Sequence, residues 1–237
     1  MVIGIKQIEL SNVHKPHTII FANFLNISMK KIIVLSLLSF FIATTSFSQN
    51  DPAAKKILDA VSTKVKSFKG ITGSFTIKSI TSKGKANGTK TGSISLKGQK
   101  YLLKQGKVEI ICDAVKIYNF DGNKTITVTA VEESGQTLSP QNLLSNFYDK
   151  DFTYKLVGSK AGFDEIELLP NDKRKNFTKV NVFVDKTKNM ITKAKVLDKS
   201  NNTIEFSITN INTTTTISDA VFTFDKKHYP KDVEILD

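Results

Sequence analysis

The sequence predicts an α+β protein dominated by one large antiparallel sheet. Residues 51–70 carry apolar side chains at helical spacing, whereas from residue 71 onward apolar residues recur with a period of two. Short turns separate these alternating runs, so consecutive strands should be neighbours in the sheet. A sheet of about eleven strands should curl to hide its edges and should carry the helices on its concave side.

The first helix has clear boundaries. Asp51 suits the N-cap, Pro52 fits the first helical position because its missing N–H is not needed there, and Gly70 is a natural stop. One apolar stripe runs along it, formed by Ile57, Leu58, Val61, Val65 and Phe68. Because almost everything that follows is expected to be strand, the sheet is the surface that should receive this stripe.

The strands follow one another at regular intervals. They are expected at 71–78, around 92–96, and at 101–104, 108–112, 115–120, 125–131, 152–157, 163–169, 179–185, 191–197 and 203–210, with a last extended piece at 232–236. Between the two groups of strands, a cap, a proline and three apolar residues in Ser139–Phe147 predict a short second helix. This helix should lie over an open end of the sheet.

The N-terminal residues carry the pattern of an export signal. Met29-Lys30-Lys31 is a basic start, and the apolar run that follows, of about 12 residues, is too short to cross a bilayer. We therefore expect residues 1–28 to be an upstream extension and residues 29–48 a signal peptide cleaved near Ser48-Gln49. Residues 49–237 should then form a single exported domain that is soluble, since no cysteine stands at the cleavage site for lipid attachment.

The charge is positive but not of the kind that binds nucleic acid. The chain holds 34 basic and 22 acidic residues; residues 1–48 hold four lysines and one glutamate, which leaves 30 and 21, or +9, for residues 49–237. Arg174 is the sole arginine, tryptophan is absent, and the lysines are scattered along alternate strand positions. A solvated sheet exterior explains this pattern, and a weak attraction to anionic membranes or acidic partners stays open.

Catalytic residues are poorly supplied. After residue 48 the sequence has one histidine, His228, in a predicted turn, and one cysteine, Cys112, in an apolar run. The acidic residues Asp164, Glu165 and Glu167 are explained by the wet face of a strand. No enzyme activity, metal or cofactor is expected.

Apolar side chains are abundant on both faces of several strands, for example around Leu102, Ile111 and Val182. Two helices cannot bury all of them tightly unless the sheet curves around them. The interior is therefore either an ordinary core or a cavity for an apolar ligand.

The order of short motifs resembles the LolA family of periplasmic lipoprotein carriers. The motifs are Val65-Lys66-Ser67-Phe68, Gly73-Ser74-Phe75-Thr76, Ser139-Pro140-Gln141-Asn142-Leu143-Leu144, Ile166-Glu167-Leu168-Leu169-Pro170, Val180-Asn181-Val182-Phe183-Val184-Asp185, Asp198-Lys199-Ser200-Asn201-Asn202, Ile217-Ser218-Asp219-Ala220 and Phe222-Thr223-Phe224. The resemblance covers essentially all of residues 51–236.

This resemblance implies an unclosed β-barrel with helices as a lid over an apolar cavity. The implied task is to accept acylated lipoproteins from an inner-membrane lipoprotein-releasing transporter and to pass them to an outer-membrane acceptor, where one exists, as a monomer. The residues expected to line the cavity and lid are Val61, Val65, Phe68, Phe75, Ile77, Leu96, Tyr101, Leu103, Tyr118, Leu143, Leu144, Phe147, Val182 and Phe206. Alternatives on the same fold are a module that senses lipids or lipoproteins and a carrier for another lipid or glycolipid.

The sequence departs from the better-known members of the family at the lid latch. Those members place an arginine beside a proline in the strand that corresponds to Leu96-Lys97-Gly98, and that arginine holds the lid helices shut. Here Lys97 is the nearest base, and it lacks the planar fork of donors of a guanidinium. The lid should therefore be held mainly by apolar contacts.

Overall fold

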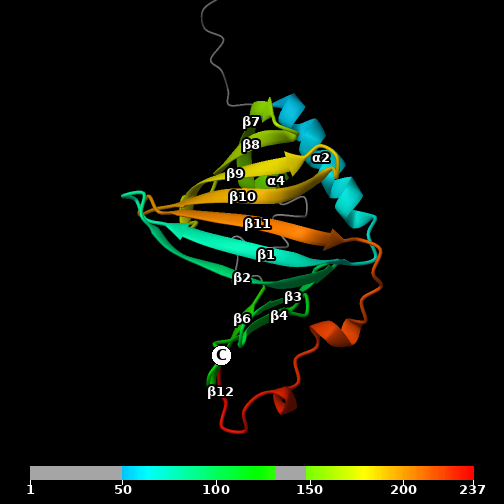
Figure 1. The fold of residues 1–237 in the computed structure, drawn as a ribbon, viewed down its shortest axis with the longest axis vertical. Coiled ribbons are helices and arrows are strands. Elements are labelled where there is room, and N and C mark those ends of the chain that lie inside the picture. The colour runs from blue at the N-terminus through cyan, green and yellow to red at the C-terminus, as the bar shows by residue number, and fades with distance from the viewer. Residues whose placement is uncertain (1–49, 132–147) are drawn as a thin grey trace, which may run out of the picture. The chain divides into compact units, whose positions relative to one another are not determined.

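The computed structural model describes residues 50–131 and 148–237, which form one twelve-stranded sheet with short helices (Figure 1). The strand order across the sheet is β12-β6-β5-β4-β3-β2-β1-β11-β10-β9-β8-β7. The predicted signal peptide, its cleavage site and the predicted helix at 139–147 lie outside the described residues.

The element bounds match most of the expected strands. The helices are α2 (Pro52–Lys66) and α4 (Tyr148–Asp151), and the 3-10 helices are η2 (Asp219–Phe222) and η3 (Lys226–His228). The strands are β1 (Ile71–Ile80), β2 (Ala86–Lys97), β3 (Lys100–Gln105), β4 (Val108–Cys112), β5 (Lys116–Phe120), β6 (Thr125–Ala130), β7 (Phe152–Lys160), β8 (Phe163–Pro170), β9 (Phe177–Asp185), β10 (Met190–Asp198), β11 (Thr203–Asn212) and β12 (Glu234–Leu236).

Two meanders meet at the centre of the sheet. Strands β1 to β6 pair in sequence order, strands β7 to β11 do the same, and β1 pairs antiparallel with β11 to join the halves. The expected count of about eleven strands is one short, because the piece Glu234–Leu236 pairs with β6. This pair is parallel, unlike the others. The sheet is unclosed, since β12 and β7 end it and do not pair with each other.

Helix α2 begins as the sequence predicts. The Asp51 side chain accepts hydrogen bonds from the backbone N–H groups of Ala53 and Ala54, and Pro52 follows it. The helix ends at Lys66, earlier than the expected stop at Gly70. Ser67 caps this end: its hydroxyl donates to the Lys64 carbonyl oxygen at 2.7 Å.

The apolar stripe of α2 is buried against the sheet. Ala54, Leu58 and Val61 are at most 2% exposed, and the main contacts of the helix are with β7 and β10. The cap also fastens the helix to the sheet, because the second Asp51 carboxylate oxygen accepts from the Leu156 N–H of β7 at 2.9 Å. The same aspartate therefore starts the helix and sets where it crosses the strands.

The registers divide the side chains of the sheet into two faces. The apolar face, on which α2 packs, carries buried residues from every central strand, including Phe75, Ile94, Ile166, Leu168, Val180, Val182, Ala194 and Ile208. The opposite, outer face of β7–β11 carries ion pairs such as Lys155–Glu167 and Lys195–Glu205. The alternation is that of a half-buried sheet.

One interaction between α2 and the sheet can be measured directly. Replacing Leu58, which is 1% exposed, by alanine should lower the free energy of unfolding by about 2–5 kcal/mol, because it leaves a cavity under the helix. Lys56→Ala on the exposed side of the same helix is the matched control and should change it by less than about 0.5 kcal/mol. Denaturant unfolding at equilibrium measures both, and equal effects would contradict the packing described.

Candidate functional site

The apolar face brings together most of the residues expected to form the site. Phe75, Ile77, Leu96, Tyr101, Leu103, Val182 and Phe206 share this face by register, and Val61, Val65 and Phe68 of the α2 segment belong to the same apolar cluster. The Phe75 and Phe206 rings stack with centroids 6.3 Å apart. Gly92 leaves space for this arrangement, since a Cβ there would lie 2.6 Å from the Phe75 ring.

The face is unevenly covered. Near α2, residues such as Ile166, Leu168 and Val182 are fully buried. On strands other than β7 and β10, which form the main contacts of the helix, several apolar side chains of the same face are only half-buried, namely Ile77, Leu103, Ile110, Ile117 and Phe206. These side chains still touch solvent and can contact an apolar ligand.

Four of the expected site residues are not placed on this face. Tyr118 points to the outer face, because it pairs with Ile111 and Val128 while its neighbour Ile117 pairs with Cys112 on the apolar face. A step of one residue along a strand reverses the side, and the sequence does not show which of the two apolar neighbours faces inward. Leu143, Leu144 and Phe147 lie outside the described residues.

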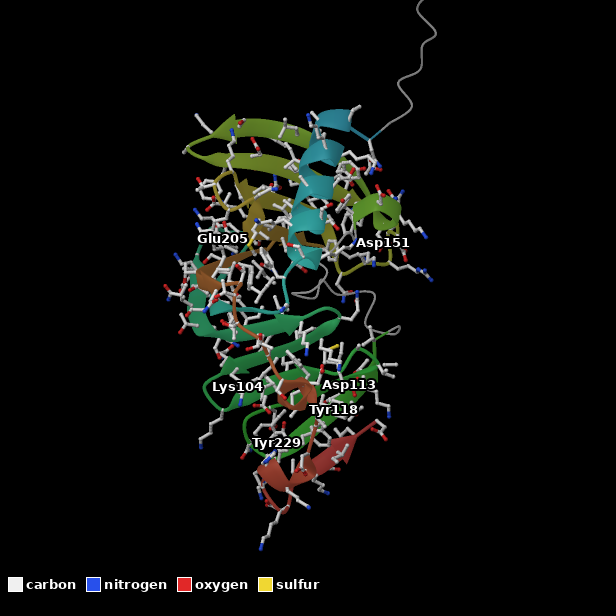
Figure 2. The ribbon with its side chains drawn as sticks, turned by 90° about the vertical axis from the view of Figure 1, so that its right-hand side faces the viewer. Lys104, Asp113, Tyr118, Asp151, Glu205 and Tyr229 are labelled. Atoms are coloured by element: carbon white, nitrogen blue, oxygen red, sulfur yellow. The ribbon has the colours of Figure 1, made fainter. Side chains whose placement is uncertain are left out.

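Tyr118 is covered by the C-terminal segment. Its ring stacks on Phe224 with centroids 4.4 Å apart, and Tyr229 packs edge-on against Phe120 at 5.1 Å. Figure 2 shows Tyr118 and Tyr229 together where the orange and red C-terminal segment crosses the green strands. Phe222 of η2 is 1% exposed. The segment therefore buries the apolar outer face of β3–β6.

Lys97 holds this C-terminal segment. Its Nζ donates to the Ile217 carbonyl oxygen at 2.9 Å and to an Asp219 carboxylate oxygen at 3.1 Å, and Lys100 binds the other oxygen at 2.9 Å. The hydrogen bonds from Lys100 and Lys97 hold the pKa of Asp219 below its ordinary value. The base considered for a lid latch thus binds partners on the outer side of the sheet, in a segment about 120 residues away in sequence.

A polar cluster fixes α2 to α4, the short helix that precedes β7. The Tyr148 hydroxyl donates to Asp59 at 2.8 Å, and Lys55 bridges Asp59 and Asp149 at 3.1 and 3.2 Å. Burial and the hydrogen bond to Asp59 raise the pKa of Tyr148, so the hydroxyl stays a donor. The cluster holds α2 against α4, where the described chain resumes after residue 147.

One buried polar atom of α2 is unusual. The Ser62 hydroxyl oxygen has no hydrogen-bond partner within the described part of the chain, although the residue is only 4% exposed. An unsatisfied buried hydroxyl costs about 1–3 kcal/mol. It lies on the core side of the helix, next to Val61, and offers one polar contact beside an otherwise apolar surface.

A separate cavity of about 860 Å³ lies mainly on the outer face of β7–β11 and β1. Most of its lining side chains alternate with those of the apolar face, among them Thr76, Lys78, Glu165, Phe183, Lys193 and Glu205. Lys193 lies over the Phe163 ring at 4.5 Å. Its lining mixes charged side chains with apolar ones such as Val157, Phe163 and Phe183. It lies mainly on the outer face, so it is not the cavity under a helical lid that the sequence predicts.

Metal ligands, a reactive thiol and a membrane-spanning helix are the other features sought in residues 50–131 and 148–237. No group of three histidine, cysteine, aspartate or glutamate residues could hold a metal ion there. Burial raises the pKa of the Cys112 thiol, which keeps it protonated and unreactive. In the same residues no helix has the length and apolar character needed to cross a membrane.

The fold and the half-covered apolar face define a class of protein: an open, mostly antiparallel sheet with a helix packed across its apolar side. A family model described as outer membrane lipoprotein carrier protein LolA matches residues 66–225. The chain therefore belongs to the LolA family, whose model describes a carrier. No curated protein sequence matches the chain.

Several solved structures are similar to the chain at low sequence identity. An uncharacterized conserved protein from Thermus thermophilus is 10% identical with a TM-score of 0.51, covering 78% of this chain and 98% of its own. A LolA superfamily protein from Nitrosomonas europaea is 13% identical with a TM-score of 0.43, covering 72% and 97%. The lipoprotein LppX of Mycobacterium tuberculosis is 11% identical with a TM-score of 0.45, covering 71% and 100%.

The attachment of the C-terminal segment should depend on pH through Glu109. Burial acts to raise the pKa of this carboxyl, but hydrogen bonds from Lys104 and from Tyr229, at 2.7 and 2.5 Å, outweigh it and lower the pKa below the ordinary 4.5. Because the folded pKa is the lower one, the carboxylate stabilises the fold above pH 4.5 and loses this effect as the pH falls through the folded value.

Glu109→Gln should therefore reduce the free energy of unfolding at neutral pH by about 1.5–3 kcal/mol and flatten its decline in acid. Urea unfolding across this pH range measures both effects. Glu234→Gln, at an exposed position of β12, is the control. A variant whose acid profile runs parallel to that of the unmodified protein would show that Glu109 does not tie the segment down.

Proposed function

We propose that the protein is a periplasmic carrier that holds the acyl chains of lipoproteins against its apolar face and delivers them from the inner to the outer membrane. The family match supports a carrier of lipoproteins. The observation that carries the proposal is the half-buried apolar group outside the main contacts of α2, formed by Ile77, Leu103, Ile110, Ile117 and Phe206.

The need for a carrier follows from the cost of wetting a lipid. Each CH₂ group moved out of a membrane costs about 0.8 kcal/mol, so a single long acyl chain costs on the order of 10 kcal/mol. A protein that shields the chains must also release them. A surface that is apolar and only partly covered satisfies both demands, because acyl chains replace solvent there without opening a fully packed core.

The partners that this proposal requires are an inner-membrane transporter that releases lipoproteins and an outer-membrane acceptor. The closing element is proposed from the sequence alone, since Leu143, Leu144 and Phe147 lie outside the described residues. In the described part of the chain, Lys97 binds Ile217 and Asp219, which supports an apolar rather than a charge-assisted closure of the face.

Binding of a triacylated lipopeptide tests the proposal, with displacement of an apolar fluorescent probe as the readout. Leu103→Asp and Phe206→Asp place a carboxylate on the half-buried apolar face and should weaken binding at least tenfold, or about 1.4 kcal/mol. Ser207→Asp is the matched control because Ser207 is the neighbour of Phe206 on the outer face.

Thermal unfolding of the same variants separates binding from folding. If the two apolar-face variants lose stability and binding in equal measure, the face is an ordinary core and the carrier proposal fails. If the protein binds a glycolipid or phospholipid more tightly than the lipopeptide, the cargo is a different lipid.

A further inference from the structure

The positive charge of the protein is concentrated in one stretch of sequence. Residues 60–108 contain no aspartate or glutamate and hold eleven lysines, at positions 64, 66, 69, 78, 83, 85, 90, 97, 100, 104 and 107. These eleven positive charges exceed the net charge of +9 of residues 49–237. The stretch spans the end of α2 and strands β1 to β3, so the charge belongs to a defined part of the fold.

These lysines differ in how they are compensated. Lys97 and Lys100 form ion pairs with Asp219, and Lys104 pairs with Glu109. Lys78, Lys83, Lys85 and Lys90 form no ion pair within residues 50–131 and 148–237, and all four are exposed. We name residues 78–90, which hold these four lysines, the basic hairpin.

The basic hairpin is presented at one end of the sheet. Ser82 to Thr91 are exposed without interruption, and Figure 1 shows this turn of the β1–β2 hairpin at the left-hand end of the strands. The Ser82 N–H donates to the Asn202 side-chain oxygen at 3.1 Å, which fixes the hairpin to the β10–β11 turn. The charges are therefore carried by an anchored ribbon.

The acidic groups near the hairpin are already engaged. Glu205, which is opposite Lys78 in the register, forms an ion pair with Lys195 at 2.9 Å. Asp198 of the adjoining turn accepts hydrogen bonds from Ser200 and Asn202. The four lysines therefore produce a positive potential that attracts anions from outside the protein.

We propose that the basic hairpin docks the protein on the anionic phosphate headgroups of a lipid bilayer. The hairpin between Ser82 and Thr91 has no aromatic residue, no large aliphatic residue and no arginine. Hot spots for protein partners need such anchors, and nucleic-acid sites favour arginine and aromatic stacking. Lipid phosphates move laterally in a bilayer, so a protein attracts them by charge and does not need side chains held in a fixed arrangement. The compact ammonium groups of lysine on a short polar hairpin meet this requirement.

A second explanation for these lysines comes from the edge of the sheet. Within the described residues, β3 pairs with β2 only over Ser93–Lys97, so Ala86–Thr91 leave one side of β2 open. Lysines on an open strand can prevent edge-to-edge aggregation. That role predicts a loss of solubility when the lysines are removed, whereas docking predicts a loss of membrane binding.

Vesicle co-sedimentation with protein produced from the full chain tests the proposal. We expect binding to phosphatidylcholine vesicles that contain phosphatidylglycerol, and weakening by salt. Phosphatidylcholine vesicles alone subtract the charge-independent contribution of the apolar run 32–43. Lys30 and Lys31 are present in every variant below, so their attraction to anionic lipid cancels when variants are compared. Cargo is absent from this assay, so its outcome is separate from that of the carrier proposal.

The triple variant Lys83→Gln, Lys85→Gln, Lys90→Gln should weaken partition at least tenfold, since each lysine near an anionic surface contributes about fivefold. The matched control changes three exposed lysines elsewhere, Lys173→Gln, Lys227→Gln and Lys231→Gln, and should weaken it less than about threefold. The control has the same net charge as the hairpin variant.

Three results would overturn the inference. Equal losses in the two triple variants would show that only net charge matters. Aggregation of the hairpin variant with unchanged vesicle partition would assign the lysines to edge protection. Binding to polyglutamate without binding to phosphatidylglycerol vesicles would identify an acidic protein segment as the occupant.

Discussion

The structure depends on one constraint: a sheet of twelve strands has two faces, and both carry apolar side chains that must be kept from water. The two halves meet this constraint on opposite sides. On the β7–β11 half, α2 covers the apolar face and the outer face is polar and rich in ion pairs. On the β3–β6 half, the C-terminal segment covers the outer face with Phe222, Phe224 and Tyr229.

This division has a consequence for binding. Because the C-terminal segment is committed to the outer face, it does not cover the half-buried group around Leu103 and Ile117 on the other side. Within the described residues, the apolar face is therefore covered mainly at the end where α2 lies. A carrier needs such asymmetry, since a fully covered face would be a core and an uncovered one would aggregate.

Charge is distributed with a similar asymmetry. On the outer face, carboxylates such as Glu167 sit between lysines, which neutralises the strands locally. In the basic hairpin the lysines have no such partners among the residues that the structure describes. Lipid binding and membrane docking would therefore use different parts of one chain, the first depending on burial of apolar area and the second on unpaired surface charge.

Local patterns in the sequence determined the elements. Asp51 and Pro52 predicted the start of α2 because capping is a matter of adjacent residues, and the period of two predicted the strands because side chains alternate along an extended backbone. The family could also be recognised from the sequence, because the order of short motifs from Val65 to Phe224 can be read without the structure. The period of two also predicted that Phe75 and Ile77 share one face of their strand.

Tertiary structure decided which face each residue serves. Ile117 and Tyr118 are both apolar in character, but only pairing with β4 assigns one to each side. The contacts of Lys97 with Ile217 and Asp219 join residues about 120 positions apart, which no local pattern encodes. The parallel pairing of β12 depends on where the C-terminal segment crosses the sheet. Periodicity states that two sides alternate; only packing between distant segments determines what covers them.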